Sequence, residues 1–342
     1  MNNKNFHRVS ISVGMATYNG AKYLREQLDS ICSQLLLPDE LVVCDDGSSD
    51  ATKKILRDFE QVSPFKFRLY ENNSNLGYSH NFGKVIDLCS CDLIFLSDQD
   101  DIWHPTKILQ MADSAIRNPR YLLFLNDAEI VLADGFKTGL TIQQQLMSLG
   151  LSDRQFSPGC CMMIRKPLKS LILPIPERGV AHDSWINLIS MNLSVKTIRD
   201  DILQSYRRHG ENVTNSLDTR VVRQNRTSLV KSYIKRSSSL SAQTRLSRLE
   251  VLAQRISDKS SLVDDLCDIN LDHKIILSNI EKEMNAVRNR IKYLTLPIFK
   301  RIVHIAYFFV TGNYHYFNGW KSFVKDLISR PSVPNDFVDF EN

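Results

Sequence analysis

The sequence lacks the features of several protein classes. The longest apolar run near its end, residues 302–310, is interrupted by His304 and is far shorter than the ~20 residues that a membrane-spanning helix needs. Residues 1–8 are polar and lead directly into an apolar strand pattern, without the hydrophobic segment of a secretion signal. We therefore expect a cytoplasmic protein without membrane spans.

Metal-binding and nucleic-acid-binding patterns are also missing. The seven cysteines form no CxxC pair, and the adjacent Cys160 and Cys161 suit neither a zinc site nor a disulfide framework. We interpret the cysteines as reduced, mostly buried thiols. Because the sequence has no zinc finger, RNP-type segment or glycine-lysine loop, we predict that the protein does not bind nucleic acid.

Positive charge is concentrated in the last third of the chain. The formal net charge is +5, and residues 220–259 hold ten Lys or Arg against Glu250 and Asp258, a local excess of eight. Such a segment can attract an anionic membrane surface or a lipid diphosphate. It can equally be an ordinary solvated helical face.

The first hundred residues alternate strand and helix patterns, as in a doubly wound α/β sheet. The expected strands are 9–15, 41–44, 67–70 and 93–96, and the expected helices are 21–35, 49–59 and 78–88. Polar clusters follow three of these strands, at residues 16–20, 45–50 and 97–105. Because open α/β sheets bind ligands at the carboxyl ends of their strands, we expect the clusters to form one site.

The rest of the chain changes character twice. Residues 121–209 combine expected strands at 122–125 and 160–164 with a helix at 183–191. Beyond about residue 216 the pattern is helical, with a seam of three-four spacing at Leu277, Ile280, Met284, Val287 and Ile291. We favour helices docked on a core over a dimerising coiled coil. The last expected helices, 299–309 and 314–328, mix aromatic and basic residues and suit an interfacial helix as well as a core one.

The third polar cluster places Asp98, Asp100 and Asp101 within four positions, directly after an expected buried strand. Carboxylates so close together cost stability unless a cation neutralises them, and oxygen ligands favour Mg²⁺ or Mn²⁺. At the end of the second strand, Asp45 or Asp46 could bind a ribose hydroxyl or the imide N–H of a pyrimidine. We therefore predict a divalent-cation site beside a nucleoside site.

In this order, Tyr18-Asn19, Asp45-Asp46-Gly47-Ser48 and the acidic cluster resemble the family 2 glycosyltransferases. The resemblance covers most of the first 210 residues and includes residues 75–77 with Asn81, residues 159–164 and residues 182–185. Residues 98–103 and 206–213 look most like the rhamnosyltransferase-like enzymes of bacterial O-antigen and capsule synthesis. The resemblance implies an α/β fold of the GT-A (Rossmann-like) type, with a mixed sheet flanked by helices. This fold would form a catalytic domain at residues 1–215, followed by an all-helical region at residues 216–342.

The resemblance also implies roles for individual residues. Asp183 would be the catalytic base, and the metal ligands would be Asp98, Asp100 and His209. The acidic motif can be framed as Asp98-x-Asp100 or as Asp100-Asp101. With Tyr18 stacked on the base, the nucleotide-sugar site would comprise Thr17, Tyr18, Asn19, Asp45, Asp46, Asn81, Asp98 and Arg208.

The expected function is an inverting transfer of one sugar from a nucleotide-sugar donor, dTDP-rhamnose or a UDP-sugar, to a lipid-linked glycan at the inner membrane. Processive synthases of the family carry Gln-x-x-Arg-Trp, whereas this chain has Gln204-Ser-Tyr-Arg207-Arg208, so we expect one sugar per visit. Two alternatives are a sugar-phosphate nucleotidyltransferase and a non-catalytic nucleotide-sugar-binding protein of the same fold.

Overall fold

The computed structural model describes residues 9–148, 151–176, 180–210, 238–266, 271–317 and 319–328. The chain divides into two compact units: residues 1–221 with 265–270, and residues 222–264 with 271–342. The predicted domain boundary between residues 215 and 216 lies outside the described residues, as does the basic segment up to residue 237. Both therefore stay predictions.

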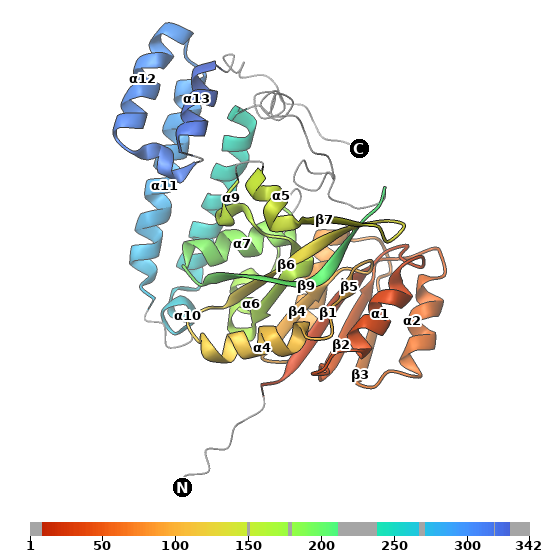
Figure 1. Cartoon of the computed structure of the whole chain (residues 1–342). Helices are drawn as coiled ribbons and strands as arrows, with labels where there is room; N and C mark the ends of the chain where they lie inside the picture. Colours follow the sequence, from red (N-terminus) through yellow and green to blue (C-terminus); the bar gives the residue numbers. More distant parts are fainter. Residues whose placement is uncertain are drawn as a thin grey trace. The chain divides into compact units, whose positions relative to one another are not determined.

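The first unit is built on a mixed nine-stranded sheet in the order β3-β2-β1-β4-β8-β6-β9-β5, with β7 paired to β6 (Figure 1). The first four strands are parallel, and β8 runs antiparallel to both β4 and β6. The strands are β1 (Ile11–Thr17), β2 (Glu40–Asp45), β3 (Lys66–Glu71), β4 (Leu93–Ser97), β5 (Ile102–Trp103), β6 (Leu123–Leu132), β7 (Lys137–Thr141), β8 (Met162–Arg165) and β9 (Lys196–Arg208).

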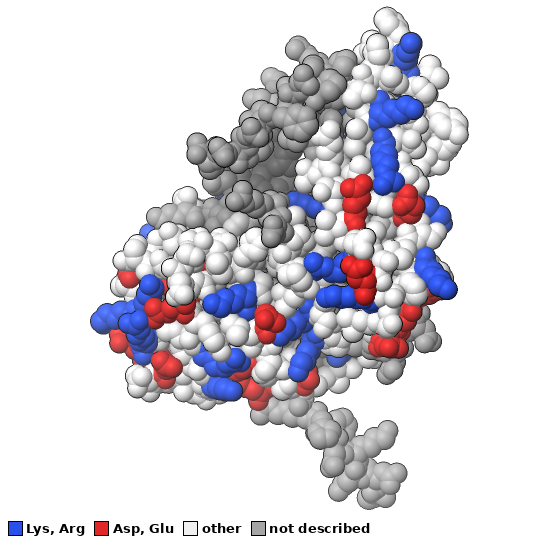
Figure 2. Space-filling view, turned by 180° about the vertical axis from the view of Figure 1, so that it is seen from behind, with Lys and Arg blue, Asp and Glu red and all other residues white. Residues whose placement is uncertain are grey.

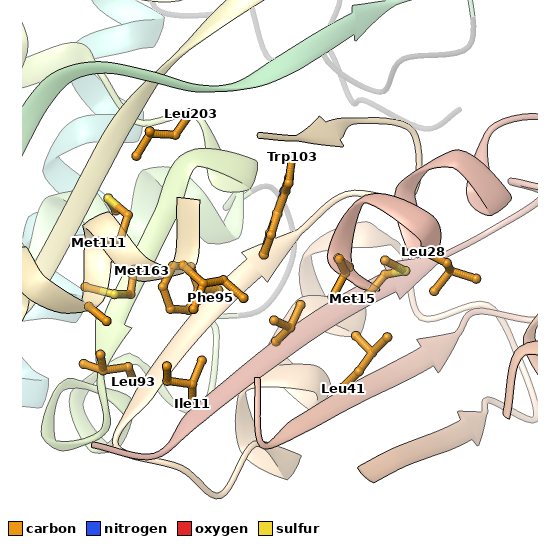
Figure 3. Close-up of a cluster of buried hydrophobic side chains, with 14 of the residues drawn as sticks. Ile11, Met15, Leu28, Leu41, Leu93, Phe95, Trp103, Met111, Met163 and Leu203 are labelled. Atoms are coloured by element: carbon orange, nitrogen blue, oxygen red, sulfur yellow. The ribbon is translucent and has the colours of Figure 1, made fainter. Parts of the chain in front are cut away.

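Helices cover both faces of this sheet. Those of the first unit are α1 (Leu24–Cys32), α2 (Thr52–Glu60), α3 (Tyr78–Leu88), α4 (Lys107–Arg117), α5 (Ile142–Ser148), α6 (Lys166–Ile172) and α7 (His182–Asn192). α1, α2 and α4 share a buried apolar cluster with alternate residues of the strands (Figure 3). On the other face, a Cβ at Gly14 would lie 2.5 Å from Val85 of α3, so glycine lets α3 pack directly on β1.

Alternation along β1 determines which residues enter the core. Ile11, Val13 and Met15 are buried in the cluster that Figure 3 shows, together with Phe95 of β4 and Trp103 of β5. Each such side chain contributes about 1.5–3 kcal/mol of burial free energy relative to exposure. The core thus sits directly behind the strand ends that carry the polar clusters.

The sequence predicted the first hundred residues well and the middle of the chain less well. The helix at 78–88 is as predicted, whereas the helix expected at 21–35 is shorter, Leu24–Cys32. In the segment 160–164 the prediction was wrong in part, because Gly159–Cys161 form a 3-10 turn before β8. β9 was missed altogether: its sequence, KTIRDDILQSYRR, has too many polar residues for a strand pattern, and it forms through pairing with β6 and β5.

The second unit is entirely helical where it is described, as predicted. Its helices are α9 (Ser238–Asp258), α10 (Ser260–Asp264), α11 (His273–Leu294), α12 (Ile298–Val310) and α13 (Trp320–Ile328). The predicted seam on α11 is confirmed at Ile280, Met284 and Val287, which are buried, and α11 packs on α9. Among the described helices, none has the length and apolar character needed to cross a bilayer.

The helix predicted at 314–328 is wrong in its first turns. Residues Asn313–Tyr316 form a separate 3-10 turn, and α13 begins at Trp320. Gly312 and Gly319 adopt positive φ values of 75° and 54°. Glycine reaches this left-handed region without steric cost, so the chain can turn at both positions.

Glu40 is a buried carboxylate at the start of β2 that links the parallel strands. It accepts hydrogen bonds from Ser12 of β1 at 2.7 Å, from the Ser90 N–H at 2.7 Å and from Arg68 of β3 at 3.1 Å. Burial opposes the charged form, but the hydrogen bonds outweigh it and lower the pKa of Glu40 to about 2. The ionised carboxylate therefore stabilises the end of the sheet opposite the polar clusters.

We predict that Glu40→Gln lowers the free energy of unfolding by about 2–3 kcal/mol near neutral pH. Because folding lowers this pKa, the stabilisation that Glu40 gives the wild type is complete above about pH 4.5 and is lost as the pH falls towards about 2. Urea unfolding at several pH values measures both effects. The matched control is Glu60→Gln at the exposed end of α2, and an equal loss in the two variants would contradict the prediction.

Candidate functional site

The carboxyl ends of β1, β2 and β4 meet at one edge of the sheet, because Thr17 pairs with Asp45 and Met15 pairs with Ser97. A cavity of about 1090 Å³ opens at this edge. The expectation that the polar clusters converge is therefore confirmed. The predicted residues that line the cavity are Thr17, Tyr18, Asn19, Asp46, Asn81, Asp98, Asp100, Asp183 and His209.

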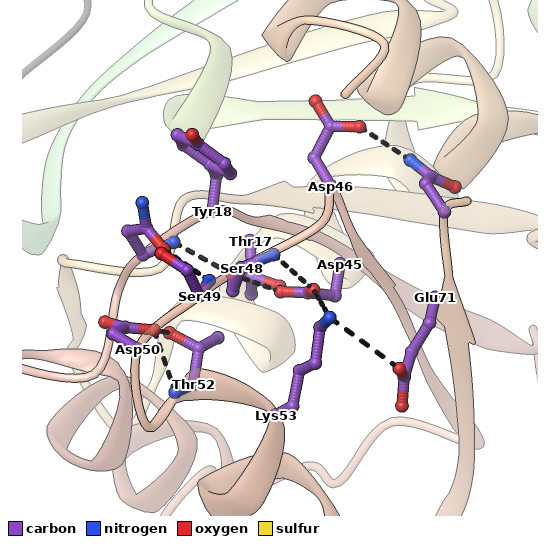
Figure 4. A network of polar contacts seen from close by, with 12 residues as sticks. Thr17, Tyr18, Asp45, Asp46, Ser48, Ser49, Asp50, Thr52, Lys53 and Glu71 are labelled. Atoms are coloured by element: carbon purple, nitrogen blue, oxygen red, sulfur yellow. Dashed lines mark hydrogen bonds and ion pairs between the residues drawn. The ribbon is translucent and has the colours of Figure 1, made fainter. Parts of the chain in front are cut away.

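The turn after β1 is locked to the turn after β2 (Figure 4). Asn19 has a positive φ of 47°, which asparagine tolerates better than most residues. Its Oδ1 accepts a hydrogen bond from the Ser49 N–H at 2.9 Å, and its N–H donates to Ser48 Oγ at 2.9 Å. Tyr18 is left 50% exposed at the cavity, so one face of its ring is available to a planar ligand.

Asp45 and Asp46 are adjacent but occupy different environments. Asp45 is fully buried and accepts hydrogen bonds from Thr17 Oγ1 at 3.0 Å and from the Ser48 N–H at 2.9 Å (Figure 4). It does not line the cavity but supports the turn beneath it. Asp46 lines the cavity and accepts the N–H groups of Leu76 and Gly77 at 2.8 and 2.9 Å. Of the two acids, the geometry favours Asp46 for ligand contact.

Asn81 is tied to the same corner by its own hydrogen bonds. Its side-chain amide donates to the Cys44 carbonyl at 2.9 Å, and its Oδ1 accepts from Asn72 at 3.0 Å. Asn72 also donates to Asp46 at 2.8 Å. Asn81 thus positions the end of β2, Asn72 and Asp46 as one unit.

Gln99 joins the acidic turn to the turn after β1. Its Oε1 accepts the Tyr18 N–H at 2.9 Å, and its Nε2 donates to the Tyr18 carbonyl at 3.0 Å. Gly20 leaves the room for this side chain, because a Cβ there would lie 2.1 Å from Gln99 Oε1. Sequence reasoning did not assign Gln99 a role, since nothing local to it points to a partner 81 residues away.

Asp101 lies beneath the cavity and is fully buried. It accepts a hydrogen bond from Gln204 Nε2 of β9 at 2.9 Å. The wholly buried Lys107 donates to the Cys160 carbonyl at 2.9 Å and to the Gln204 side chain, and its ammonium lies 4.0 Å from the centre of the Trp103 ring. Burial lowers the pKa of Lys107, and its amino group lies next to the acidic turn, a contribution that the sequence did not reveal.

Two carboxyl groups of the acidic turn, those of Asp98 and Asp101, resist ionisation. Burial, and then the charges of Asp100, Asp101 and Asp183, raise the pKa of Asp98 well above its usual range. Burial and Asp100 raise the pKa of Asp101 to about 7. Groups held close in this way are relieved when a cation replaces the protons.

The donor set fits a divalent cation. Potential ligand atoms of Asp98, Asp101 and Cys160 lie within 4.8 Å of one another, and His209 Nε2 lies 2.7 Å from Asp100 Oδ2. Of the predicted ligands, Asp100 and His209 contact each other, whereas Asp98 lies in a different candidate group, with Asp101 and Cys160. Asp101 was already an alternative in the sequence, and the structure adds Cys160. Hard oxygen ligands dominate this set, which suits Mg²⁺ or Mn²⁺.

Asp183 stands at the wall of the cavity in the first turn of α7. Its Oδ1 accepts the Ser184 N–H at 2.5 Å, and its charge contributes to the raised pKa of Asp98. The preceding His182 is buried and stacks on Phe82 with ring centres 4.1 Å apart. Burial lowers the pKa of His182, which favours the neutral ring. The packed ring of His182 supports the backbone next to Asp183.

Arg207 anchors the end of β9 to the acidic turn. Its Nε donates to the Asp100 carbonyl at 3.1 Å, its guanidinium pairs with Glu26 of α1, and it lies 4.7 Å from the centre of the Tyr23 ring. Arg208 does not line the cavity, and its Nη1 is buried without a hydrogen-bond partner among the described residues. The structure therefore gives the contacts at this strand end to Arg207 and His209.

The chain matches known proteins over this same region. Residues 12–171 match the profile of "Glycosyl transferase family 2". A dTDP-rhamnosyl transferase of Shigella flexneri is 31% identical over 163 residues, covering 44% of this chain and 54% of that protein. An uncharacterised protein of Mycobacterium tuberculosis is 29% identical over 215 residues, and the match spans 61% of this chain and 62% of its length.

The fold itself occurs in solved structures. Residues 1–349 of S. aureus TarS, crystallised with UDP-GlcNAc, align with a TM-score of 0.52 at 19% identity, covering 90% of this chain and 89% of that one. At this identity the likeness concerns the fold alone. The predicted GT-A fold, a mixed sheet flanked by helices with a helical C-terminal region, is confirmed.

We predict that Mn²⁺ raises the melting temperature more at about pH 8 than at about pH 6, because protons compete for the carboxylates below the pKa of Asp101, about 7. Without a cation, a raised pKa makes stability fall as the pH rises through this range. Differential scanning fluorimetry measures both trends. Asp101→Asn should weaken the dependence on pH, and equal Mn²⁺ effects at both pH values would count against the site.

Proposed function

We propose that this chain, whose residues 12–171 match the profile of glycosyl transferase family 2, belongs to that family and transfers a single sugar from a nucleotide-sugar donor to an acceptor hydroxyl. One observation carries the proposal. An exposed Tyr18, the carboxylates of Asp46, Asp98 and Asp100, and a separate carboxylate on α7, Asp183, all line one cavity. Recognition of a nucleoside, binding of a cation that neutralises the diphosphate, and proton abstraction each need one of these groups.

In this proposal the donor lies across the carboxyl ends of β1, β2 and β4. The nucleoside occupies the corner where Tyr18 stacks on the base, beside Asp46. Thr17, Asn19 and Asn81 complete this corner, supported from beneath by Asp45. Asp98 belongs to the diphosphate side, whereas the predicted Arg208 does not line the cavity and is left out of the proposed donor site.

Asp98, Asp100 and His209 would hold Mg²⁺ or Mn²⁺, with Asp101 and Cys160 adjacent. When bound, the cation supplies Lewis-acid neutralisation of the charge that develops on the leaving nucleoside diphosphate. The protein's part is to keep the carboxylates in place, and Gln99, Gln204, Lys107 and Arg207 do so through the contacts described above.

Asp183 is proposed as the general base. Its carboxylate takes the proton of the acceptor hydroxyl as the acceptor oxygen forms its bond to the anomeric carbon. The bond from that carbon to the phosphate oxygen breaks in the same step, and the nucleoside diphosphate leaves with the electron pair. A single displacement inverts the anomeric centre.

For the donor we propose dTDP-rhamnose, with a UDP-sugar as the alternative, and for the acceptor a lipid-linked glycan of bacterial O-antigen or capsule synthesis at the inner membrane. The name of the Shigella flexneri relative supports the rhamnosyl donor. A thermal-shift panel of nucleotide sugars with Mn²⁺ tests the choice, since at equal ligand concentration the donor with the highest affinity stabilises the folded protein most. Release of nucleoside diphosphate identifies a transferase, whereas a nucleotidyltransferase would exchange pyrophosphate.

We predict that Asp183→Asn lowers the rate of transfer by about 10²–10⁴-fold, because an amide cannot accept the proton. The donor should bind with wild-type affinity, since Asp183 is assigned to the acceptor side. Single-turnover kinetics and donor titration separate the two effects. Asp113→Asn on the exposed surface of α4 is the matched control, and wild-type turnover in Asp183→Asn would remove Asp183 from the mechanism.

The two hydrogen bonds between the Gln99 side chain and the Tyr18 backbone, here called the Gln99 clamp, give a different prediction. Gln99→Ala removes two hydrogen bonds to the Tyr18 backbone, each worth about 1 kcal/mol, so donor affinity should fall by about tenfold. Gly20→Ala should reproduce this loss, because its Cβ would displace the Gln99 side chain. Isothermal titration with the donor measures both variants. Unchanged affinity in both would show that the two turns hold their positions without the clamp.

A further inference from the structure

The last helices of the second unit expose apolar side chains on their outer faces. On α12, Phe299 is 85% exposed, Val303 68% and Val310 84%, and their spacing places them on one side of the helix. Ile298, Ile302, Tyr307 and Phe309 are also more than a third exposed. On α13, Trp320, Val324 and Ile328 form a second exposed row at four-residue spacing. Apolar surface of this extent marks an interaction site.

α12 buries a charged residue and exposes apolar ones, whereas a helix on the surface of a protein usually does the opposite. The residues that face inward are Arg301, Ile305 and Phe308, and Arg301 is fully buried. The apolar residues are not left outside for lack of a core, because Ile305 and Phe308 pack with Ala286 and Tyr314 inside the unit. The outer faces are therefore apolar in addition to a complete inner core.

A buried polar network holds α13 in this orientation. Arg290 of α11 makes two hydrogen bonds of 2.8 Å to the Asp326 carboxylate, and Tyr314 Oη donates to the same group at 2.9 Å. The Arg290 guanidinium also lies 4.3 Å from the centre of the Phe317 ring. Bidentate pairing fixes direction as well as distance, so the row of Trp320, Val324 and Ile328 is held outward.

The charge around this apolar surface is of one sign. Residues 291–328 contain five basic residues and a single acid, Asp326, which is buried against Arg290. Arg301 and Lys325 are buried as well, so the cations available at the surface are Lys292, Lys300 and Lys321. In Figure 2, the uppermost coloured part of this unit carries Lys and Arg among uncharged side chains and no Asp or Glu. Apolar and aromatic residues flanked by cations are complementary to an anionic lipid surface.

We propose that the outer faces of α12 and α13 form a monotopic membrane-binding surface that inserts into the headgroup region of an anionic bilayer. α12 has 13 residues, too few to cross a bilayer, so the helices lie in the interface. The proposal rests on the proposed function in one respect: a lipid-linked acceptor would be located at this membrane. It specifies the residues that would bring the catalytic domain to that acceptor.

Trp320 provides a direct test in the complete protein. It is 64% exposed, whereas the other two tryptophans, Trp103 and Trp185, are 2% and 0% exposed. Vesicles of phosphatidylglycerol and phosphatidylcholine should therefore shift the tryptophan emission to shorter wavelength, and Trp320→Phe should abolish the shift. Vesicles of phosphatidylcholine alone should give a weaker shift, because the cations then lack an anionic partner.

Vesicle co-sedimentation of surface variants gives the second test. Phe299→Ser combined with Val310→Ser should weaken binding at least about tenfold, and Lys300→Gln with Lys321→Gln should weaken binding to anionic vesicles only. The matched control is Leu35→Ser with Val62→Ser, which changes two residues 69% and 65% exposed in the first unit and should leave binding intact. Circular dichroism confirms that each variant is folded.

Two outcomes would overturn the proposal. The first is vesicle binding that is unchanged in the Phe299 and Val310 double variant, or an emission of Trp320 that vesicles do not alter. The second is self-association of the wild type without vesicles that the double variant abolishes, which would assign the surface to a second copy of the chain. Sugar transfer to a water-soluble acceptor should proceed at the wild-type rate in all these variants. If the wild-type protein itself showed no such transfer, the proposed function would be contradicted and the membrane proposal would not.

Discussion

The structure depends on how three neighbouring carboxylates are held at the end of one buried strand. Asp98, Asp100 and Asp101 follow β4 directly, and the pKa values of Asp98 and Asp101 are raised because burial and mutual repulsion disfavour their charges. Repulsion of this kind would drive an unsupported turn apart. The surrounding elements supply the opposing contacts, and the cavity takes its shape from them.

Most of this support comes from β9 and α4. Gln204 and Arg207 reach the turn from β9, and the side chain of Lys107 lies beneath it from α4, where it donates to the Cys160 carbonyl. Gln99 then connects the turn to the backbone of Tyr18. A ligand that touches Tyr18 and a cation that touches the carboxylates would therefore meet parts of one hydrogen-bonded assembly, which is how an active site keeps its groups positioned before the substrate arrives.

In the second unit, buried polar contacts determine the orientation of helices. Its buried Arg290–Asp326 pair and the aromatic rings that meet Phe308 edge to face give α11, α12 and α13 a core of their own. A buried ion pair contributes little net stability but determines orientation. That orientation is what leaves apolar residues of α12 and α13 on the outside.

By itself, the sequence determined the alternation of strands and helices in the first hundred residues, the convergence of three polar clusters, and the helical seam around Ile280 and Val287. These follow from local periodicity and from the rule that parallel strands end together. Only the tertiary structure decided that Asp46 rather than Asp45 faces the cavity, that Lys107 and Arg207 support the acidic turn, and that α12 turns its apolar face outward. Arg207 and Asp100 are 107 residues apart, and no local pattern encodes such a contact, because it arises when the polar strand β9 finds its place between β6 and β5.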